Sequence, residues 1–188
     1  MPTNYEQFTA SDQIDKNLLD NDIHYLHGDI ASENVGDAIK WILSANLHKK
    51  PKRTLKLYIN TYGGDLYEAF ALIDIMKNSH HPIATYGIGA VMSAGFLIFA
   101  SGHHGERYIG KNAGSMNHQH SDEMSSKMHD MKAQMKENQN CEMRCLQILK
   151  EATNMTIQEV RNKFIKNPSD QYYTAKQMVE LNVADQIL

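Results

Sequence analysis

Short apolar runs alternate with longer segments of helical periodicity along most of the chain. Runs rich in β-branched and aromatic residues predict strands, and apolar residues that recur every three or four positions predict amphipathic helices. Strands are predicted at residues 23–27, 55–60, 83–88, 107–109 and 115–118. Helices are predicted from Ser32 onward, over residues 65–78 and 96–100, and in two short segments at 156–165 and 174–181. Such alternation of strands and helices is typical of an α/β protein.

A long segment, residues 121–153, contains neither Gly nor Pro and predicts one continuous helix. Met124, Met128, Met131 and Met135 repeat along it at intervals of four, three and four residues. A methionine stripe usually belongs to a core, and a groove for a short-lived partner is a less favoured alternative. On a helix that is otherwise polar, near-heptad spacing favours a third interpretation, a seam that meets another copy of the chain.

Length and composition predict one domain over residues 1–188, with residues 1–21 as an N-terminal segment. The chain is 41% hydrophobic and 22% charged, within the range of ordinary globular domains. A formal net charge of −3 gives no reason to expect nucleic acid or an anionic membrane as partner. Because no apolar stretch approaches the length of a membrane span and the N-terminus lacks the pattern of a signal peptide, we expect a cytoplasmic location.

The two cysteines, Cys141 and Cys145, lie four residues apart on the long predicted helix. This spacing places both thiols on one face without the geometry of a disulfide. Together with His120 or His129 they could form half of a metal site, but no second ligand pair has recognisable spacing. We therefore expect no metal and no organic cofactor.

The candidate chemistry centres on Ser93, which lies where a predicted strand meets a short apolar helix. A serine becomes a nucleophile when an imidazole accepts its proton and a carboxylate orients the imidazole. The first turn of the following helix leaves backbone N–H groups without internal partners, so the Ala94 N–H can face an oxyanion. The paired glycines Gly63 and Gly64, after the strand at residues 55–60, can bring a second N–H close to a ligand, and Gly64 is the favoured donor.

Each of these signals also has an ordinary structural explanation. A Gly-Gly pair between strand and helix is usually a turn, a serine at a helix start is usually a cap, and a given histidine is usually structural. Asp65 is better explained as a helix N-cap than as a catalytic carboxylate. The combination of these signals, rather than any one of them, points to catalysis.

In this order and with these flanks, the chain resembles the ClpP family, the proteolytic subunits of the Clp proteases, from about Asp22 to the C-terminus. The matching segments are residues 57–60 with Gly63 and Gly64, residues 88–89 and 93–95, residues 100–102 with 107–108, residues 118–119, and Ala175, 179–180 and 184–188. The resemblance implies an α/β, ClpP/crotonase-like fold with a protruding helical handle at about residues 119–153. It also implies an assembly of stacked heptameric rings that receives polypeptide substrates from an AAA+ unfoldase.

By the same resemblance, Ser93 is the nucleophile, His118 the general base and Asp170 the orienting acid, with the N–H groups of Gly64 and Ala94 as the oxyanion hole. The resulting hypothesis is a serine endopeptidase that acts through an acyl-enzyme. The chain departs from the family pattern before the double glycine, before Ser93, upstream of Asp170 and at His120, which replaces a proline.

Those departures keep open a second hypothesis, a non-catalytic ring subunit that retains the fold for assembly. An enoyl-CoA hydratase-like enzyme of the same fold is disfavoured because it has no need of a paired serine and histidine. An α/β-hydrolase is also disfavoured, because Val91 stands where the first glycine of the Gly-x-Ser-x-Gly motif belongs.

Overall fold

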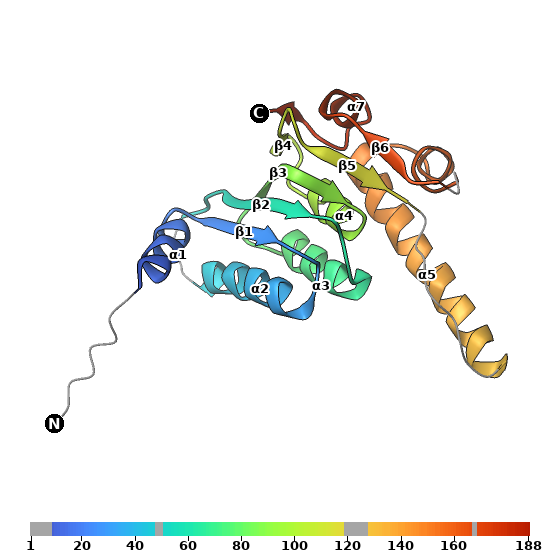
Figure 1. The fold of residues 1–188 in the computed structure, drawn as a ribbon, viewed down its shortest axis with the longest axis horizontal. Helices are drawn as coiled ribbons and strands as arrows, with labels where there is room; N and C mark the ends of the chain where they lie inside the picture. Colours follow the sequence, from blue (N-terminus) through green and yellow to red (C-terminus); the bar gives the residue numbers. More distant parts are fainter. Residues whose placement is uncertain (1–8, 48–50, 119–127, 167–168) are drawn as a thin grey trace.

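The computed structural model describes residues 9–47, 51–118, 128–166 and 169–188, and within these a mostly parallel sheet forms the centre of the molecule (Figure 1). The main path of the sheet is β1 (Ile23–His27), β2 (Leu55–Thr61), β3 (Ile83–Met92), β4 (Arg107–Ile109) and β7 (Gln186–Ile187), all parallel. Two further strands, β5 (Gly114–Asn117) and β6 (Gln171–Tyr173), branch from β3. The predicted α/β fold class is therefore confirmed.

Helices connect the strands, and α2 and α3 lie side by side along β1 and β2 (Figure 1). The helices are α1 (Ala10–Asp20), α2 (Ser32–Leu47), α3 (Leu66–Lys77), α4 (Ala94–Ala100), α5 (Met128–Thr153), α6 (Ile157–Val160), the π-helix η1 (Arg161–Ile165) and α7 (Ala175–Glu180). Asp65 caps α3, as predicted, by accepting hydrogen bonds from the N–H groups of Tyr67 and Glu68, and Thr174 caps α7.

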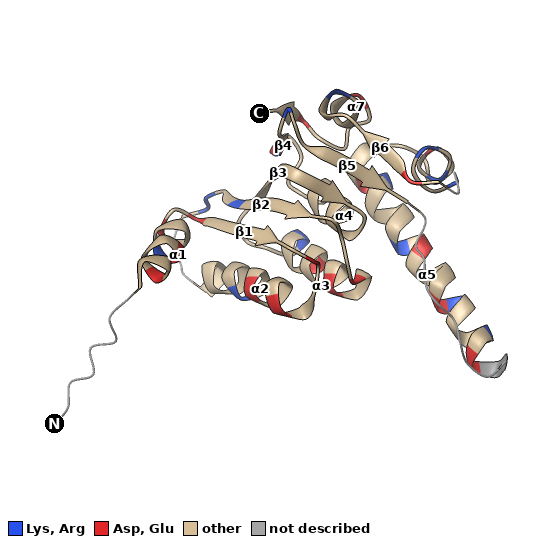
Figure 2. Cartoon of the chain, in the orientation of Figure 1, with Lys and Arg blue, Asp and Glu red and all other residues tan. Residues whose placement is uncertain are grey.

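The structure adds three elements that the sequence pattern did not predict, α1, β6 and β7. It also begins the long helix, α5, at Met128, and residues 121–127 of the predicted helix lie outside the described residues. The helix extends away from the sheet as the expected handle does (Figure 1). Lys and Arg are interspersed with Asp and Glu along α5 (Figure 2), a pattern typical of a solvated helix surface.

Strand β3 changes its neighbour halfway along its length, and this change positions the site. Its first half pairs with β4, whereas Ala90, Val91 and Met92 pair with β5. Gly89, at φ +60°, allows the bend, and a Cβ there would lie 2.5 Å from the side-chain oxygen of Asn60. The same oxygen accepts a hydrogen bond from the Ala90 N–H at 3.0 Å. The bend carries β3 onward to Ser93 and α4.

Arg107 joins the C-terminal ends of two helices to the last strand. Its guanidinium is 2% exposed and makes a two-pronged contact with Asp185, at 2.9 and 2.7 Å. The same group donates to the carbonyls of Ala152, at the end of α5, and of Ala100, at the end of α4. Burial opposes the charge on Asp185, but the hydrogen bonds and charge of Arg107 outweigh it and hold the pKa of that carboxyl below its usual range.

The two faces of the sheet differ in burial. Leu55, Leu57 and Ile59 of β2 are fully buried against the core, and the intervening residues are half-buried on the opposite face. On that face Tyr58, Tyr86 and Tyr108 stack in a row, with ring centroids 4.6 and 4.8 Å apart. Within the described chain, no helix is both long enough and apolar enough to cross a membrane.

Candidate active site

Ser93 lies between the end of β3 and the buried helix α4, in a backbone conformation that is unusual for a side chain other than glycine. Its φ is +52° and its ψ is −121°, and its side chain makes no capping hydrogen bond to the helix. The Ser93 N–H donates to the Met116 carbonyl at 2.9 Å, which fixes the turn against β5. The hydroxyl is therefore presented outward from a strained turn instead of serving as the cap.

The double glycine after β2 approaches Ser93 closely. A Cβ at Gly63 would lie 2.6 Å from the Ser93 Cβ, and a Cβ at Gly64 would lie 2.4 Å from the Ile30 carbonyl oxygen. Both glycines have positive φ, +114° and +149°. The glycine pair in the sequence predicts Gly64 as a donor, whereas only the structure shows that Gly63 must lack a side chain for the turn to reach the serine.

His118 follows β5 directly, and its ring meets the serine. The distance between Ser93 Oγ and His118 Nε2 is 2.8 Å, which is a hydrogen bond. The preceding residue, Asn117, donates its side-chain amide to the Phe164 carbonyl at 3.0 Å and so fixes the end of the strand. His120, the alternative imidazole, lies outside the described residues.

Asp170 reaches the same place because β6 pairs antiparallel with β5. The register places Gln171 opposite Asn117, so the residues just beyond this pair, Asp170 and His118, are neighbours. Asp170 Oδ1 lies 3.9 Å from His118 Nδ1, within ion-pair range but longer than a hydrogen bond. The structure thus brings all three predicted side chains together. Ser93 and His118 are within hydrogen-bonding distance, whereas His118 and Asp170 are not.

The proposed oxyanion donors flank the serine on two sides. Ala94 is the first residue of α4, and Gly64 precedes the cap of α3. Among the described residues, neither of these N–H groups has a hydrogen-bond acceptor. Both remain available to a negatively charged oxygen.

A cavity of about 120 Å³ opens beside Ser93 and His118. Its apolar lining comes from Leu66, Leu97 and Ile165. A larger hollow of about 910 Å³, between α1, β1 and α2, includes neither the serine nor the histidine, so the smaller cavity is the one relevant to chemistry at Ser93.

Helix α5 lines the same cavity with Glu142 and Cys145, two residues that the sequence analysis did not assign to the site. Burial raises the pKa of the Cys145 thiol to about 12, so the thiol stays protonated and does not compete with Ser93 as a nucleophile. Cys141 and Cys145 are both free and buried. No group of three His, Cys, Asp or Glu side chains gathers as metal ligands in the part of the chain that the structure describes.

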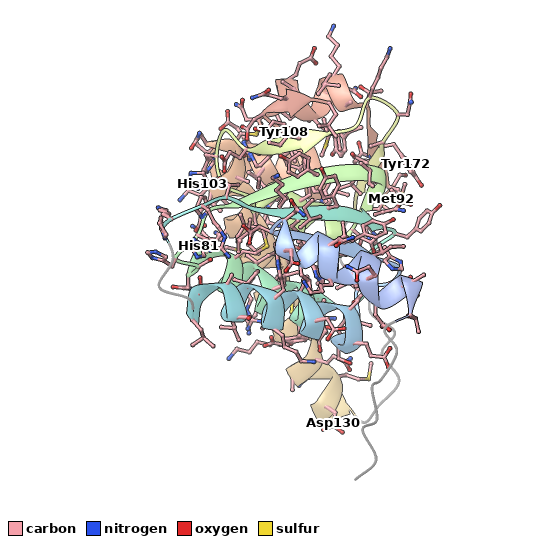
Figure 3. All side chains as sticks on the ribbon, turned by 90° about the vertical axis from the view of Figure 1, so that its left-hand side faces the viewer. His81, Met92, His103, Tyr108, Asp130 and Tyr172 are labelled. Atoms are coloured by element: carbon pink, nitrogen blue, oxygen red, sulfur yellow. The ribbon has the colours of Figure 1, made fainter. Side chains whose placement is uncertain are left out.

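The site lies at one end of the strands. Met92, the residue before Ser93, pairs with Met116, which in turn pairs with Tyr172 of β6. Figure 3 shows Met92 and Tyr172 on one side of the molecule and His81 and His103 on the other. A hydroxyl–imidazole pair therefore lies at the carboxyl ends of parallel strands, beside backbone N–H groups without acceptors among the described residues.

The chain belongs to the Clp protease family, because the sequence model of that family, described as Clp protease, matches residues 6–188. One relative, the ATP-dependent Clp protease proteolytic subunit 1 of Leifsonia xyli subsp. xyli, is 30% identical over 90% of this chain and 84% of its own length. The subunit of the same name from Corynebacterium jeikeium is 27% identical over 94% of this chain and 92% of its own. Proteolytic subunit 2 of Corynebacterium diphtheriae is 27% identical over 95% of this chain and 87% of its own length.

Proposed function

We propose that this chain is a serine endopeptidase that cleaves unfolded polypeptides through an acyl-enzyme, as the proteolytic subunit of a Clp-type complex. The observation that carries the proposal is the 2.8 Å contact between Ser93 Oγ and His118 Nε2. A hydrogen bond of this length is what a general base needs in order to accept the serine proton.

In the first half of the reaction, Ser93 Oγ bonds to the carbonyl carbon of the substrate while its proton passes to His118 Nε2. The C–N bond then breaks, and His118 returns the proton to the departing amine. In the second half, His118 takes a proton from water, and the resulting hydroxide bonds to the carbonyl carbon. The ester bond to Ser93 breaks, and its oxygen recovers the proton from His118, so that the enzyme is restored.

The negative oxygen that forms in each half faces the N–H groups of Gly64 and Ala94. One such donor contributes about 3–4 kcal/mol to transition-state stabilisation in comparable sites. Asp170 holds the proton of His118 on Nδ1, which leaves Nε2 free to accept from the serine. From its present 3.9 Å, Asp170 closes to hydrogen-bonding distance when substrate binds, because catalytic hydrogen bonds are often longer in the free enzyme.

Copies of this chain would also associate with one another. The row of stacked tyrosines on the half-buried sheet face and the exposed methionines of α5 are surfaces that neighbouring copies would cover, as in stacked heptameric rings. Enclosing the serine in such a chamber, with an AAA+ unfoldase as partner, would restrict cleavage to polypeptides that have been unfolded. This arrangement suits a cytoplasmic location.

A non-catalytic ring subunit is the alternative, and the long distance between His118 and Asp170 favours it. Incubation of the assembled protein with a chemically unfolded, fluorophore-labelled polypeptide separates the two functions. The peptidase releases fluorescent fragments, and Ser93→Ala lowers the rate by at least about a thousandfold. A wild-type rate equal to that of Ser93→Ala would support the structural subunit instead.

A further inference from the structure

One member of a charged pair, Glu142, forms part of the wall of the cavity beside Ser93. Glu142, on α5, lines the cavity and makes an ion pair with Arg161, the first residue of the π-helix η1. Their side chains are 21% and 36% exposed. The guanidinium of Arg161 also contacts the Met143 sulfur at 3.7 Å, so it is held on α5 at two points.

The π-helix that carries Arg161 also contributes to the lining of the cavity. Ile165, its last residue, lines the cavity, and the carbonyl of Phe164 accepts the hydrogen bond from Asn117. Insertions of π type frequently occur at functional sites, where they redirect a few side chains. The segment from Arg161 to Ile165 therefore supplies both the countercharge of Glu142 and an apolar surface next to the serine.

The position of the cavity indicates which part of a substrate it would bind. The cavity is bounded by the hydroxyl of Ser93 and by Gly64, which together flank the carbonyl under attack. The substituent that can reach such a space is the side chain of the residue that contributes this carbonyl. A volume of about 120 Å³ equals that of about four water molecules in the liquid, which suits a side chain of about four heavy atoms.

We propose that Glu142 and Arg161 determine the specificity of this pocket, and that their mutual neutralisation makes it select uncharged side chains of medium size. This inference rests on the proposed peptidase function. Glu142 is the acidic residue of the wall, and a partly buried carboxylate attracts a cationic side chain strongly unless another cation offsets it. Arg161 supplies that cation, so the pocket offers apolar contacts from Leu66, Leu97 and Ile165 without a net charge.

The test compares two peptide substrates that differ only in the terminal group of one side chain. Fluorogenic peptides carry norvaline or 2,4-diaminobutyric acid before the scissile bond, so that a terminal methyl is replaced by an ammonium of nearly the same size. Wild type should prefer norvaline. Arg161→Gln should raise the ratio of kcat/KM for diaminobutyrate over norvaline by about tenfold, which corresponds to about 1.4 kcal/mol. Glu142→Gln should lower the same ratio.

Two further variants control for general effects. The double variant Glu142→Arg/Arg161→Glu rebuilds a neutral pair and should return the ratio toward that of wild type. Lys77→Gln breaks the ion pair between Lys77 and Glu151, which also joins α5 to a neighbouring element but does not line the cavity, and should leave the ratio unchanged.

Labelling of Ser93 by a fluorophosphonate, followed in every variant, distinguishes the two ways in which the inference can fail. If Ser93 is labelled at the wild-type rate in both Arg161→Gln and Glu142→Gln and neither changes the ratio, the specificity assignment is wrong and the peptidase proposal stands. If wild type itself is neither labelled nor active, the peptidase proposal fails and the inference falls with it.

Discussion

Ser93 shows how a single residue departs from the ordinary rules of helix initiation. A serine at this position normally caps the helix with its hydroxyl, and it avoids positive φ. Here the backbone is held at φ +52° by the hydrogen bond to Met116 and by the close approach of Gly63, and the hydroxyl contacts His118 instead. Under the proposed function, this strain falls on the residue whose side chain is the nucleophile.

His81 is a second residue whose surroundings define its protonation. It is 1% exposed; its Nδ1 accepts from the Arg53 N–H at 3.3 Å, and its Nε2 lies 3.3 Å from the Ala45 carbonyl. Nδ1 can accept this hydrogen bond only when it carries no proton, so the ring is neutral; Nε2 also lies 3.3 Å from Arg53 Nη1. Burial is the main reason that the pKa of His81 is lowered, and the nearby Arg53 charge adds to it.

We therefore expect the free energy of unfolding to fall as the pH is lowered from about 7.5 to about 5.5. Below the ordinary histidine pKa, of about 6.5, the unfolded chain takes up a proton that folded His81 does not, so the stability present above that pH is progressively lost. In His81→Gln, urea unfolding should show a smaller decrease over the same range.

His103→Gln is the matched control, because His103 is exposed and should keep the wild-type dependence on pH. Equal slopes for wild type and His81→Gln would show that His81 does not resist protonation in the folded state.

At the residue scale, several residues of the candidate site could be predicted from the sequence. The apolar segment after Ser93, the double glycine and the His118–Gln119 pair each have a local signature in the sequence, and the structure brings Ser93, Gly63 and His118 together. It could not show that Glu142 and Ile165 line the same cavity, because their proximity to Ser93 arises only from the packing of α5 and η1.

Among the elements, those with one buried face were predictable. The strand β2 alternates strictly, and α2 and α3 bury residues at helical spacing. Helix α1 was missed because its apolar residues, Ile14, Leu18 and Leu19, are few among polar neighbours, and none of them is buried. Its N-terminus is set instead by a capping box, in which Thr9 and Asp12 exchange hydrogen bonds.

The C-terminal elements departed from prediction for a related reason. One helix was predicted at residues 156–165, but α6 ends after four residues and continues as the π-helix η1. The wider turn allows Phe164 to pack against Phe96 and Tyr173, and Phe96 is fully buried. Tertiary packing of this kind leaves no periodic signal in the sequence. Strand β6 spans three residues and forms because β5 offers it a partner.

At the scale of the whole molecule, helix α5 exposes apolar side chains to solvent. Met131 and Met135 on α5 are 37% and 53% exposed, and they continue the methionine seam that predicts self-association. Met128 begins the described helix, and Met124 lies outside the described residues. An apolar seam on a polar helix is stable in water when another helix packs against it.

If the seam joins two rings, Met131→Glu/Met135→Glu should separate them, because burying four or more carboxylates against one another is strongly unfavourable. Light scattering should then give a mass of about half the wild-type assembly. Ala133→Glu adds the same charge at an exposed position of α5 outside the seam and should leave the mass unchanged. A wild-type mass for the double methionine variant would exclude this seam as a contact between copies.

The most direct test of the account is to treat the assembled protein with a fluorophosphonate and locate the modified residue by mass spectrometry. We expect a single adduct on Ser93, formed quickly in wild type, much more slowly in Asp170→Asn, and absent in Ser93→Ala. Modification at another serine, or none at Ser93 in a correctly assembled protein, would contradict the claim that Ser93, His118 and Asp170 act together as a catalytic unit.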